Sequence, residues 1–280
     1  MGDNWTPIYG DFDCEANAVA YWLHENGLSQ EAFIQYNWDF YYDEDEELLR
    51  GCIQVPQLIE FLRAKYELSV TELTFDDLPV HELVIIPGNA YWLPYAADYY
   101  LTQRLVHYYP ACKASDGTIK VWDPIFSNMG GEVKEYVLRK AFEELDRTAL
   151  RLQRKQLVVP KEQLVPHILS TDYEASYRRA VEQVLPRVYE LLGRQGDLRK
   201  DLDYKRYFGN LQSILIGRER YFQTVSSSLA DSILNAWRNV VKRCMRLSYL
   251  RQEGWEAFVN SITQAIKTEI IFLRGLTNSN

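Results

Sequence analysis

The sequence predicts an α+β fold in two parts, with helices and strands mixed in the first half and helices alone in the second. Up to about residue 150, short runs of β-branched and aromatic residues alternate with apolar residues at helical spacing. Beyond Pro160 and Pro166 the pattern changes to long helical periodicity. We therefore expect one mixed domain over residues 1–160 and a helical domain over residues 161–280.

The first half is expected to begin with a helix over residues 14–26. Val19, Trp22 and Leu23 recur there at helical spacing, and Gly27 ends the helix. The later elements of this half are a helix over 55–66, a buried strand over 83–86 ended by Pro87-Gly88, strands over 104–109 and 118–122, a helix over 132–145 and a strand over 150–159.

A hairpin should join the strands over 104–109 and 118–122, because Asp116-Gly117 between two alternating runs is a strong turn signal. The second half should hold helices over 173–192, 204–224, 228–250 and 255–273, with Pro186 kinking the first of them. The amphipathic helix over 228–250 could form a dimer face as easily as a docking surface for a partner protein.

Composition bounds the class of protein. A chain of 280 residues that is 47% hydrophobic can bury a full core. The N-terminus lacks a basic segment followed by an apolar run, and no apolar stretch reaches the roughly 18 residues that span a membrane, so we expect neither signal peptide nor membrane span. Cys14, Cys52, Cys112 and Cys244 are scattered without paired spacing, which argues against disulfides or structural zinc and fits the reducing cytoplasm.

Charge divides unevenly along the chain. Residues 1–150 have a balance of −16 and residues 151–280 a balance of +8, which give the net −8. Such asymmetry suggests two units with different partners, although Arg-rich solvated helices would produce it as well. The basic residues alternate with acids on long helices, a pattern that argues against nucleic acid as a partner.

Cys14 is the first candidate for chemistry. It follows Asp13, a good N-cap residue, so its sulfur should lie at the positive end of a helix dipole, which favours a thiolate. The negative charges of Asp11, Asp13 and Glu15 would oppose ionisation unless they point away. The alternative is a small buried cysteine at a helix start.

His107 and Asp123 complete the candidate site. They lie 16 positions apart on consecutive strands, so a hairpin would bring their side chains to one end of a sheet. A thiol needs an imidazole to take its proton, and the imidazole needs a third group to orient it. The order of the three residues is that of a papain-like active site. Alone, His107 would suit a hydrogen-bonded core position and Asp123 a turn before proline.

Other chemistries find less support. His24 lies about three turns from Cys14, His81 precedes a strand and His167 lies in the linker. Clustered metal ligands, a Gly-rich phosphate loop and a G-x-S-x-G elbow are all absent from the sequence, so we expect no metal and no bound cofactor.

The motifs around these residues resemble the BtrH-like family of butirosin biosynthesis proteins. They are Asp13-Cys14-Glu15-Ala16-Asn17, Tyr91-Trp92-Leu93-Pro94-Tyr95, Val106-His107-Tyr108 and Val121-Trp122-Asp123-Pro124. The resemblance covers about the first 160 residues, and it extends more distantly to bacterial papain-like peptidases that process bacteriocin leaders. It implies a papain-like cysteine acyltransferase fold with Cys14 as nucleophile, His107 as general base and then acid, and Asp123 as the orienter of His107.

The resemblance also implies a reaction. The namesake of the family moves an aminoacyl group from a carrier-protein thioester to an amine of an aminoglycoside. We therefore expect an acyl or peptidyl carrier protein as partner, with the donor on its phosphopantetheine, and a small-molecule amine as acceptor. Where the peptidase relatives have an upstream glutamine for the oxyanion hole, this chain reads Pro7-Ile8-Tyr9-Gly10, so a second oxyanion donor beside the Cys14 N–H is unidentified.

Acceptor binding is assigned to Tyr95 and to Asp98, a lone charge among apolar neighbours; aromatic faces and carboxylates suit ammonium groups. Two other readings stay open. The same triad would serve a cysteine peptidase, amidase or thioester hydrolase, and a non-catalytic module could use the fold to bind a synthetase. A homodimer through the second-half helices is a further expectation.

Overall fold

The computed structural model describes residues 13–44, 48–123, 130–154, 166–170, 172–193, 202–250 and 254–278. The chain divides into two compact units, each built from two separate stretches. Unit 1 comprises Met1–Gln30 and Gln54–Glu162, and unit 2 comprises Glu31–Ile53 and Gln163–Asn280. The described elements combine helices with an antiparallel sheet, so the expected α+β class is confirmed at that level.

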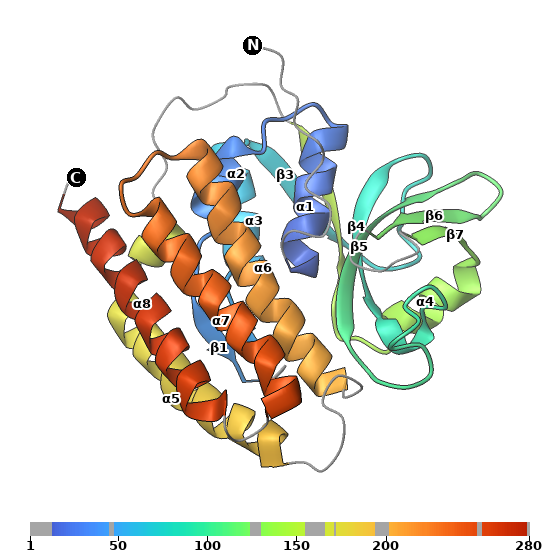
Figure 1. The fold of residues 1–280 in the computed structure, drawn as a ribbon. Coiled ribbons are helices and arrows are strands. Elements are labelled where there is room, and N and C mark those ends of the chain that lie inside the picture. Colours follow the sequence, from blue (N-terminus) through green and yellow to red (C-terminus); the bar gives the residue numbers. More distant parts are fainter. Residues whose placement is uncertain are drawn as a thin grey trace. The chain divides into compact units, whose positions relative to one another are not determined.

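Unit 1 is built on a six-stranded antiparallel sheet in the order β3-β8-β4-β5-β6-β7 (Figure 1). In chain order the strands are β3 (Leu68–Leu73), β4 (Leu83–Asn89), β5 (Val106–Lys113), β6 (Ile119–Trp122), β7 (Gly130–Val133) and β8 (Ala149–Arg154). The central strands β4 and β5 pair along their full length, from Leu83↔Cys112 to Asn89↔Val106.

Helices cover both faces of this sheet. The helix α1 (Cys14–Glu25) packs against β5 and β4, and α4 (Glu135–Glu143) packs on the opposite side of β4 together with the short η1 (Ala90–Trp92) (Figure 1). Trp22 fixes α1 by donating its Nε1–H to the Leu83 carbonyl at 3.2 Å. The helix α3 (Val55–Lys65) packs against β3. The face under α4 is an apolar core that includes Ile86, Val121 and Leu138.

The predicted β5–β6 hairpin is present. Gly117 in its turn has φ +80°, which a side chain would strain, and the Asp116 carboxylate accepts the Thr118 N–H at 2.9 Å. The prediction that Pro87-Gly88 ends the preceding strand is wrong, because β4 continues through both to Asn89. Proline is tolerated there because β8 pairs with β4 only at Ile85, short of Pro87. A backbone N–H at position 87 would therefore have no hydrogen-bond acceptor on β8.

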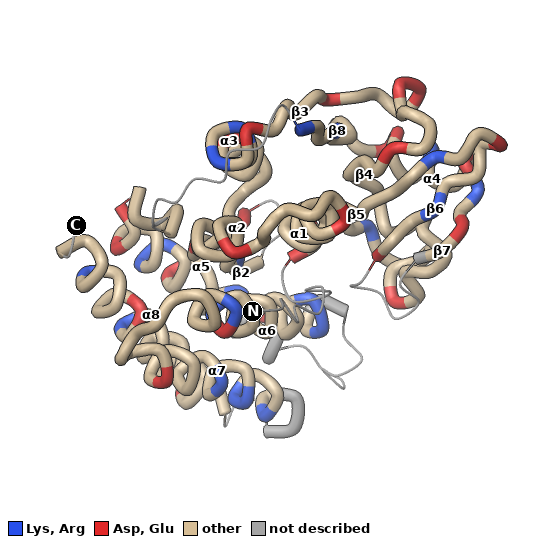
Figure 2. The backbone as a smooth tube through the Cα atoms, turned by 90° about the horizontal axis from the view of Figure 1, so that it is seen from above, with Lys and Arg blue, Asp and Glu red and all other residues tan. Residues whose placement is uncertain are grey.

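Unit 2 contains the long helices expected for the second half. They are α5 (Tyr173–Gly193), α6 (Leu202–Thr224), α7 (Ala230–Leu250) and α8 (Trp255–Thr277). The unit also holds α2 (Glu31–Tyr36), the two-stranded β1 (Tyr41–Asp43) with β2 (Leu48–Arg50), and η2 (His167–Ser170). Basic residues recur along α7 (Figure 2). Among the described residues, no helix is both long and apolar enough to cross a membrane.

Residues 31–53 differ from the expected division, which placed them in the first domain. They belong to unit 2 because α2, β1 and β2 pack against α5 and α6, and one of the residues that hold them there is Arg218 of α6. Its guanidinium is buried and donates to the carbonyls of Gly51 at 2.9 Å and Asp39 at 2.8 Å, and it lies over the Trp38 ring at 4.0 Å. Pairing with Glu269 compensates the burial of this charge.

Glu269 on α8 is the centre of that network. Its carboxylate accepts from Arg218 Nε at 2.8 Å, from Trp237 Nε1 at 2.5 Å and from the Tyr177 hydroxyl. Burial alone would lower the pKa of Arg218, but the charge of Glu269 raises it above its ordinary value. Side chains from α5, α6, α7 and α8 therefore meet at one satisfied, fully buried carboxylate.

Candidate active site

Cys14 is the first residue of α1, and the predicted cap is present. The Asp13 carboxylate accepts the Ala16 N–H at 3.2 Å, which commits this acid to the backbone. The Cys14 side chain is buried, and its thiol donates to Glu15 Oε2 at 3.2 Å. The helix dipole thus favours the thiolate while Glu15 stabilises the protonated thiol. Asp11, the third acid expected to act on this thiol, lies outside the described residues.

The structure brings His107 and Asp123 together. Nε2 of His107 lies 2.7 Å from Oδ2 of Asp123, and the two side chains are 2% and 1% exposed. His107 is the second residue of β5, and Asp123 directly follows β6, so the hairpin register produces the pair. With Asp123 ionised, Nε2 carries a proton and donates it, and Nδ1 becomes the basic nitrogen.

Two buried tyrosines enclose this pair. The Tyr109 ring centroid lies 6.0 Å from that of His107. Burial, and after it the Asp123 charge, raises the pKa of Tyr109; burial, Tyr109 and Asp123 raise the pKa of Tyr95 well above its ordinary value. Both phenols therefore stay protonated beside the carboxylate.

Gly88 gives this arrangement room. It pairs with His107 across β4 and β5, and a Cβ at this position would approach the Tyr109 hydroxyl to 2.7 Å. The candidate site predicted from the sequence included neither Gly88 nor Tyr109. Strand alternation was the available signal, since Tyr109 lies two residues after His107 and must share its face.

The helix that begins with Cys14 packs against β5. Tyr21 of α1 contacts Trp122 at a ring-centroid distance of 5.8 Å, and the β5–β6 register places Trp122 on the same face as Tyr108. An ionised Glu15, and Cys14 when its thiol is deprotonated, also contribute to raising the pKa of Tyr108, after the larger effect of burial. His107 alternates with Tyr108 and points to the other face of β5, so the packing of α1 on β5 does not by itself bring the Cys14 thiol to the imidazole.

A pocket of about 440 Å³ opens on the Tyr108 face of unit 1. Its lining comes from α3, β3, β5, β8 and the turn before β8, and comprises Val55, Pro56, Ile59, Glu60, Arg63, Glu72, Tyr108, Arg147, Thr148 and Leu150. The Tyr108 hydroxyl is fixed in its wall, where it accepts from Arg147 Nη1 at 2.7 Å. The sequence pattern gives no sign that Tyr108 and Arg147 form this pair.

The two proposed acceptor residues lie in different surroundings. Tyr95 is buried beside Asp123, in the environment of the histidine rather than in a described pocket. Asp98 is exposed in the segment between β4 and β5, and it lines neither of the two described pockets.

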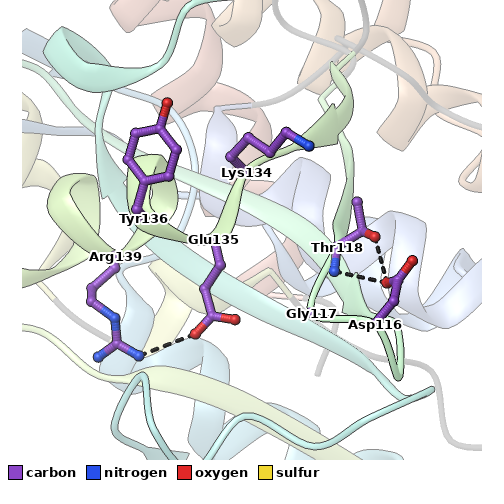
Figure 3. Close-up of a pocket in the computed structure, with 7 residues that line it drawn as sticks. All are labelled: Asp116, Gly117, Thr118, Lys134, Glu135, Tyr136 and Arg139. Atoms are coloured by element: carbon purple, nitrogen blue, oxygen red, sulfur yellow. Dashed lines mark hydrogen bonds and ion pairs between the residues drawn. The ribbon is translucent and has the colours of Figure 1, made fainter.

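The second pocket, of about 460 Å³, lies at the β5–β6 turn and the start of α4 (Figure 3). Its side chains include Lys134, the exposed Tyr136 and the ion pair of Glu135 with Arg139, but none of the candidate catalytic residues. Within the described parts of the chain, no group of three or more His, Cys, Asp or Glu could hold a metal ion.

The remaining histidines take no part in the site. His24 is exposed near the end of α1, and His81 bonds to Ser115 at 2.6 Å. His167 belongs to unit 2, where Nδ1 lies 3.6 Å from Asp39. The four cysteines are free thiols.

Comparison with known proteins adds no assignment: no family model and no curated protein matches this chain. The resemblance to BtrH-like proteins therefore stays a prediction, as does the papain-like character of the α+β unit.

Proposed function

We propose that unit 1 is a papain-like cysteine acyltransferase that moves an acyl or aminoacyl group from a carrier-protein thioester to an amine. The observation that supports this most is the buried His107–Asp123 pair at 2.7 Å, on the strand against which the capped Cys14 helix packs. A buried carboxylate on one imidazole nitrogen makes the other a base, and a first-turn cysteine is a favourable place for a thiolate.

The first half-reaction loads the enzyme. His107 Nδ1 accepts the Cys14 proton, and the thiolate attacks the thioester carbonyl to form a tetrahedral intermediate. When the intermediate collapses, the carbon–sulfur bond to the carrier breaks and the departing thiolate takes the proton from His107. The products are acyl-Cys14 and a free carrier thiol. Because one thioester replaces another, the free energy of this exchange is close to zero.

The second half-reaction releases the product. An amine attacks acyl-Cys14, and His107 takes the proton that the amine loses. The carbon–sulfur bond to Cys14 then breaks, and the departing thiolate takes that proton from His107. Thioester to amide conversion is downhill, so the reaction needs no nucleotide. Asp123 holds the ring and stabilises the imidazolium that forms in each half.

Charge supports the choice of partners. The acidic first half suits a cationic amine, and the basic residues of α7 suit an acidic carrier protein. Reversing Arg238, Arg243 and Arg246 together should weaken carrier binding and reduce its dependence on salt. Unchanged binding would exclude α7 as the docking surface.

The discharge of the loaded enzyme distinguishes transfer from hydrolysis. Protein acylated with a simple thioester would be mixed with a panel of small amines or with buffer alone, and the acyl-enzyme followed by intact mass. Faster loss with amines, together with an amide product, is expected for the transferase. Loss at the same rate in buffer would assign the hydrolase reaction instead.

A further inference from the structure

Attack on a thioester places negative charge on the carbonyl oxygen, and this oxyanion needs two donors. The backbone N–H of Cys14 is one, because N–H groups in the first turn of a helix have no partner within the helix. The glutamine that supplies the second donor in the peptidase relatives has no counterpart in Pro7-Ile8-Tyr9-Gly10, so the candidates for this donor lie on the described elements that pack with α1. Tyr108 meets the requirements.

The Tyr108 hydroxyl is arranged to donate. Its side chain is 5% exposed, and the hydrogen bond described for its oxygen is one that it accepts from Arg147 Nη1 at 2.7 Å. Accepting from a guanidinium leaves the O–H proton available and polarises it, which strengthens it as a donor. Burial keeps the phenol neutral by raising its pKa, although Arg147 acts in the opposite direction.

Its position is also suitable. Tyr108 lies on the face of β5 against which α1 packs, since the β5–β6 register places it on the same face as Trp122, which Tyr21 of α1 contacts. Tyr108 also lines the 440 Å³ pocket, so an acyl group whose carbonyl oxygen accepted from its hydroxyl would have space for its chain beside it.

The lining of the pocket indicates the class of acyl group. Val55, Pro56, Ile59 and Leu150 form an apolar wall. Arg63, which donates to the Val70 carbonyl at 3.0 Å, and the carboxylates of Glu60 and Glu72 add polar groups. A pocket of this size and composition suits an acyl chain with an apolar body and a polar end.

We infer that Tyr108, oriented by Arg147, is the second oxyanion donor of the Cys14 reaction, and that the neighbouring pocket receives an apolar-bodied acyl chain. This inference rests on the proposed acyl transfer at Cys14. The hydrogen bond moves no proton, so the balance of each half-reaction is unchanged.

The test compares two reactions of the same thiol. Acylation by an N-acetylcysteamine thioester passes through an oxyanion, whereas alkylation by iodoacetamide does not. Tyr108→Phe should slow acylation by about 10²-fold and leave alkylation unchanged. Arg147→Gln should slow acylation less, and the double variant should be no slower than Tyr108→Phe alone. Tyr136→Phe, at an exposed tyrosine of unit 1, is the matched control and should react as wild type.

A substitution in the lining tests separately whether the pocket receives the acyl chain. Ile59→Trp should slow acylation by an octanoyl thioester several-fold more than acylation by an acetyl thioester, because only the longer chain needs the filled space. Equal effects on both chains would overturn the assignment of the pocket.

Each failure has a different form. A wild-type protein that no thioester acylates would overturn the proposed function and this inference with it. A wild type that is acylated, with Tyr108→Phe reacting at the same rate, would overturn the role of Tyr108 alone. Equal losses of acylation and alkylation in Tyr108→Phe would also reject the oxyanion role, since the tyrosine would then act on the thiol or the fold.

Discussion

Replacing Glu269 by Ala should be among the most destabilising single changes in unit 2. The variant removes the acceptor of three buried donors, on Arg218, Trp237 and Tyr177. An unpaired buried guanidinium costs about 3–5 kcal/mol, and each unsatisfied neutral donor about 1–3 kcal/mol. The effects of losing several hydrogen bonds of one network are not fully additive, so we expect Glu269→Ala to lower the free energy of unfolding by about 5 kcal/mol. The whole free energy of unfolding of a typical domain is only about 5–15 kcal/mol.

Urea unfolding measures this loss. Trp38 and Trp237 are buried in unit 2 and report on it by fluorescence, with circular dichroism as the second probe. Tyr177→Phe is the matched mild variant and should cost about 1 kcal/mol, since it removes one hydrogen bond and leaves the ion pair.

A double-mutant cycle isolates the ion pair. Arg218→Met combined with Glu269→Leu should be more stable than the sum of the two single changes predicts, by at least about 2 kcal/mol, because no charge is then left buried alone. Additive single changes, or a Glu269→Ala variant that loses less than about 1 kcal/mol, would refute the view that this network holds residues 31–53 on the helices.

The other predictions concern unit 1 and the buried thiol and phenol of unit 2. Gly88→Ala should push the Tyr109 hydroxyl from its place and cost about 1–3 kcal/mol in urea unfolding; a neutral effect would show that the space is not needed. Asp123→Asn should slow acylation of Cys14 roughly 10²-fold with little change in stability, whereas an unchanged rate would remove Asp123 from the mechanism. Burial raises the pKa of Cys244 from 9.0 to about 12 and that of Tyr221 from 10.0 to about 12, so their protonated forms stabilise the fold below pH 9. That contribution should disappear as pH rises towards 12, because the unfolded chain ionises first; stability that stays flat over this range in alkaline unfolding would contradict it.

Local signals predicted the elements that carry the candidate site. Asp13 before a helical pattern predicted the cap of α1, and Asp116-Gly117 predicted the hairpin that joins His107 to Asp123. These features depend on a few neighbouring residues, so they are readable without the rest of the fold. The four long helices of unit 2 were predicted for the same reason, from sustained apolar periodicity.

Long-range features were not predictable in this way. Residues 31–53 join unit 2 through Arg218, about 170 positions away, and their aromatic pattern gives no sign of this partner. The Tyr108–Arg147 pair needs the order of the sheet strands, which depends on pairing between segments far apart in sequence. Pro87-Gly88 predicts a strand end wrongly because the sequence does not show which strand edges lack a partner.

The most direct test of the central claim is the intact mass of the protein after incubation with acyl-loaded carrier protein or a simple acyl thioester, with wild type beside Cys14→Ala. Cys52→Ala is the matched control for a buried cysteine outside the site. We predict a mass gain of one acyl group on wild type and Cys52→Ala and none on Cys14→Ala. Acylation that persists in Cys14→Ala, or that no thioester produces in wild type, would contradict the assignment of Cys14 as the nucleophile.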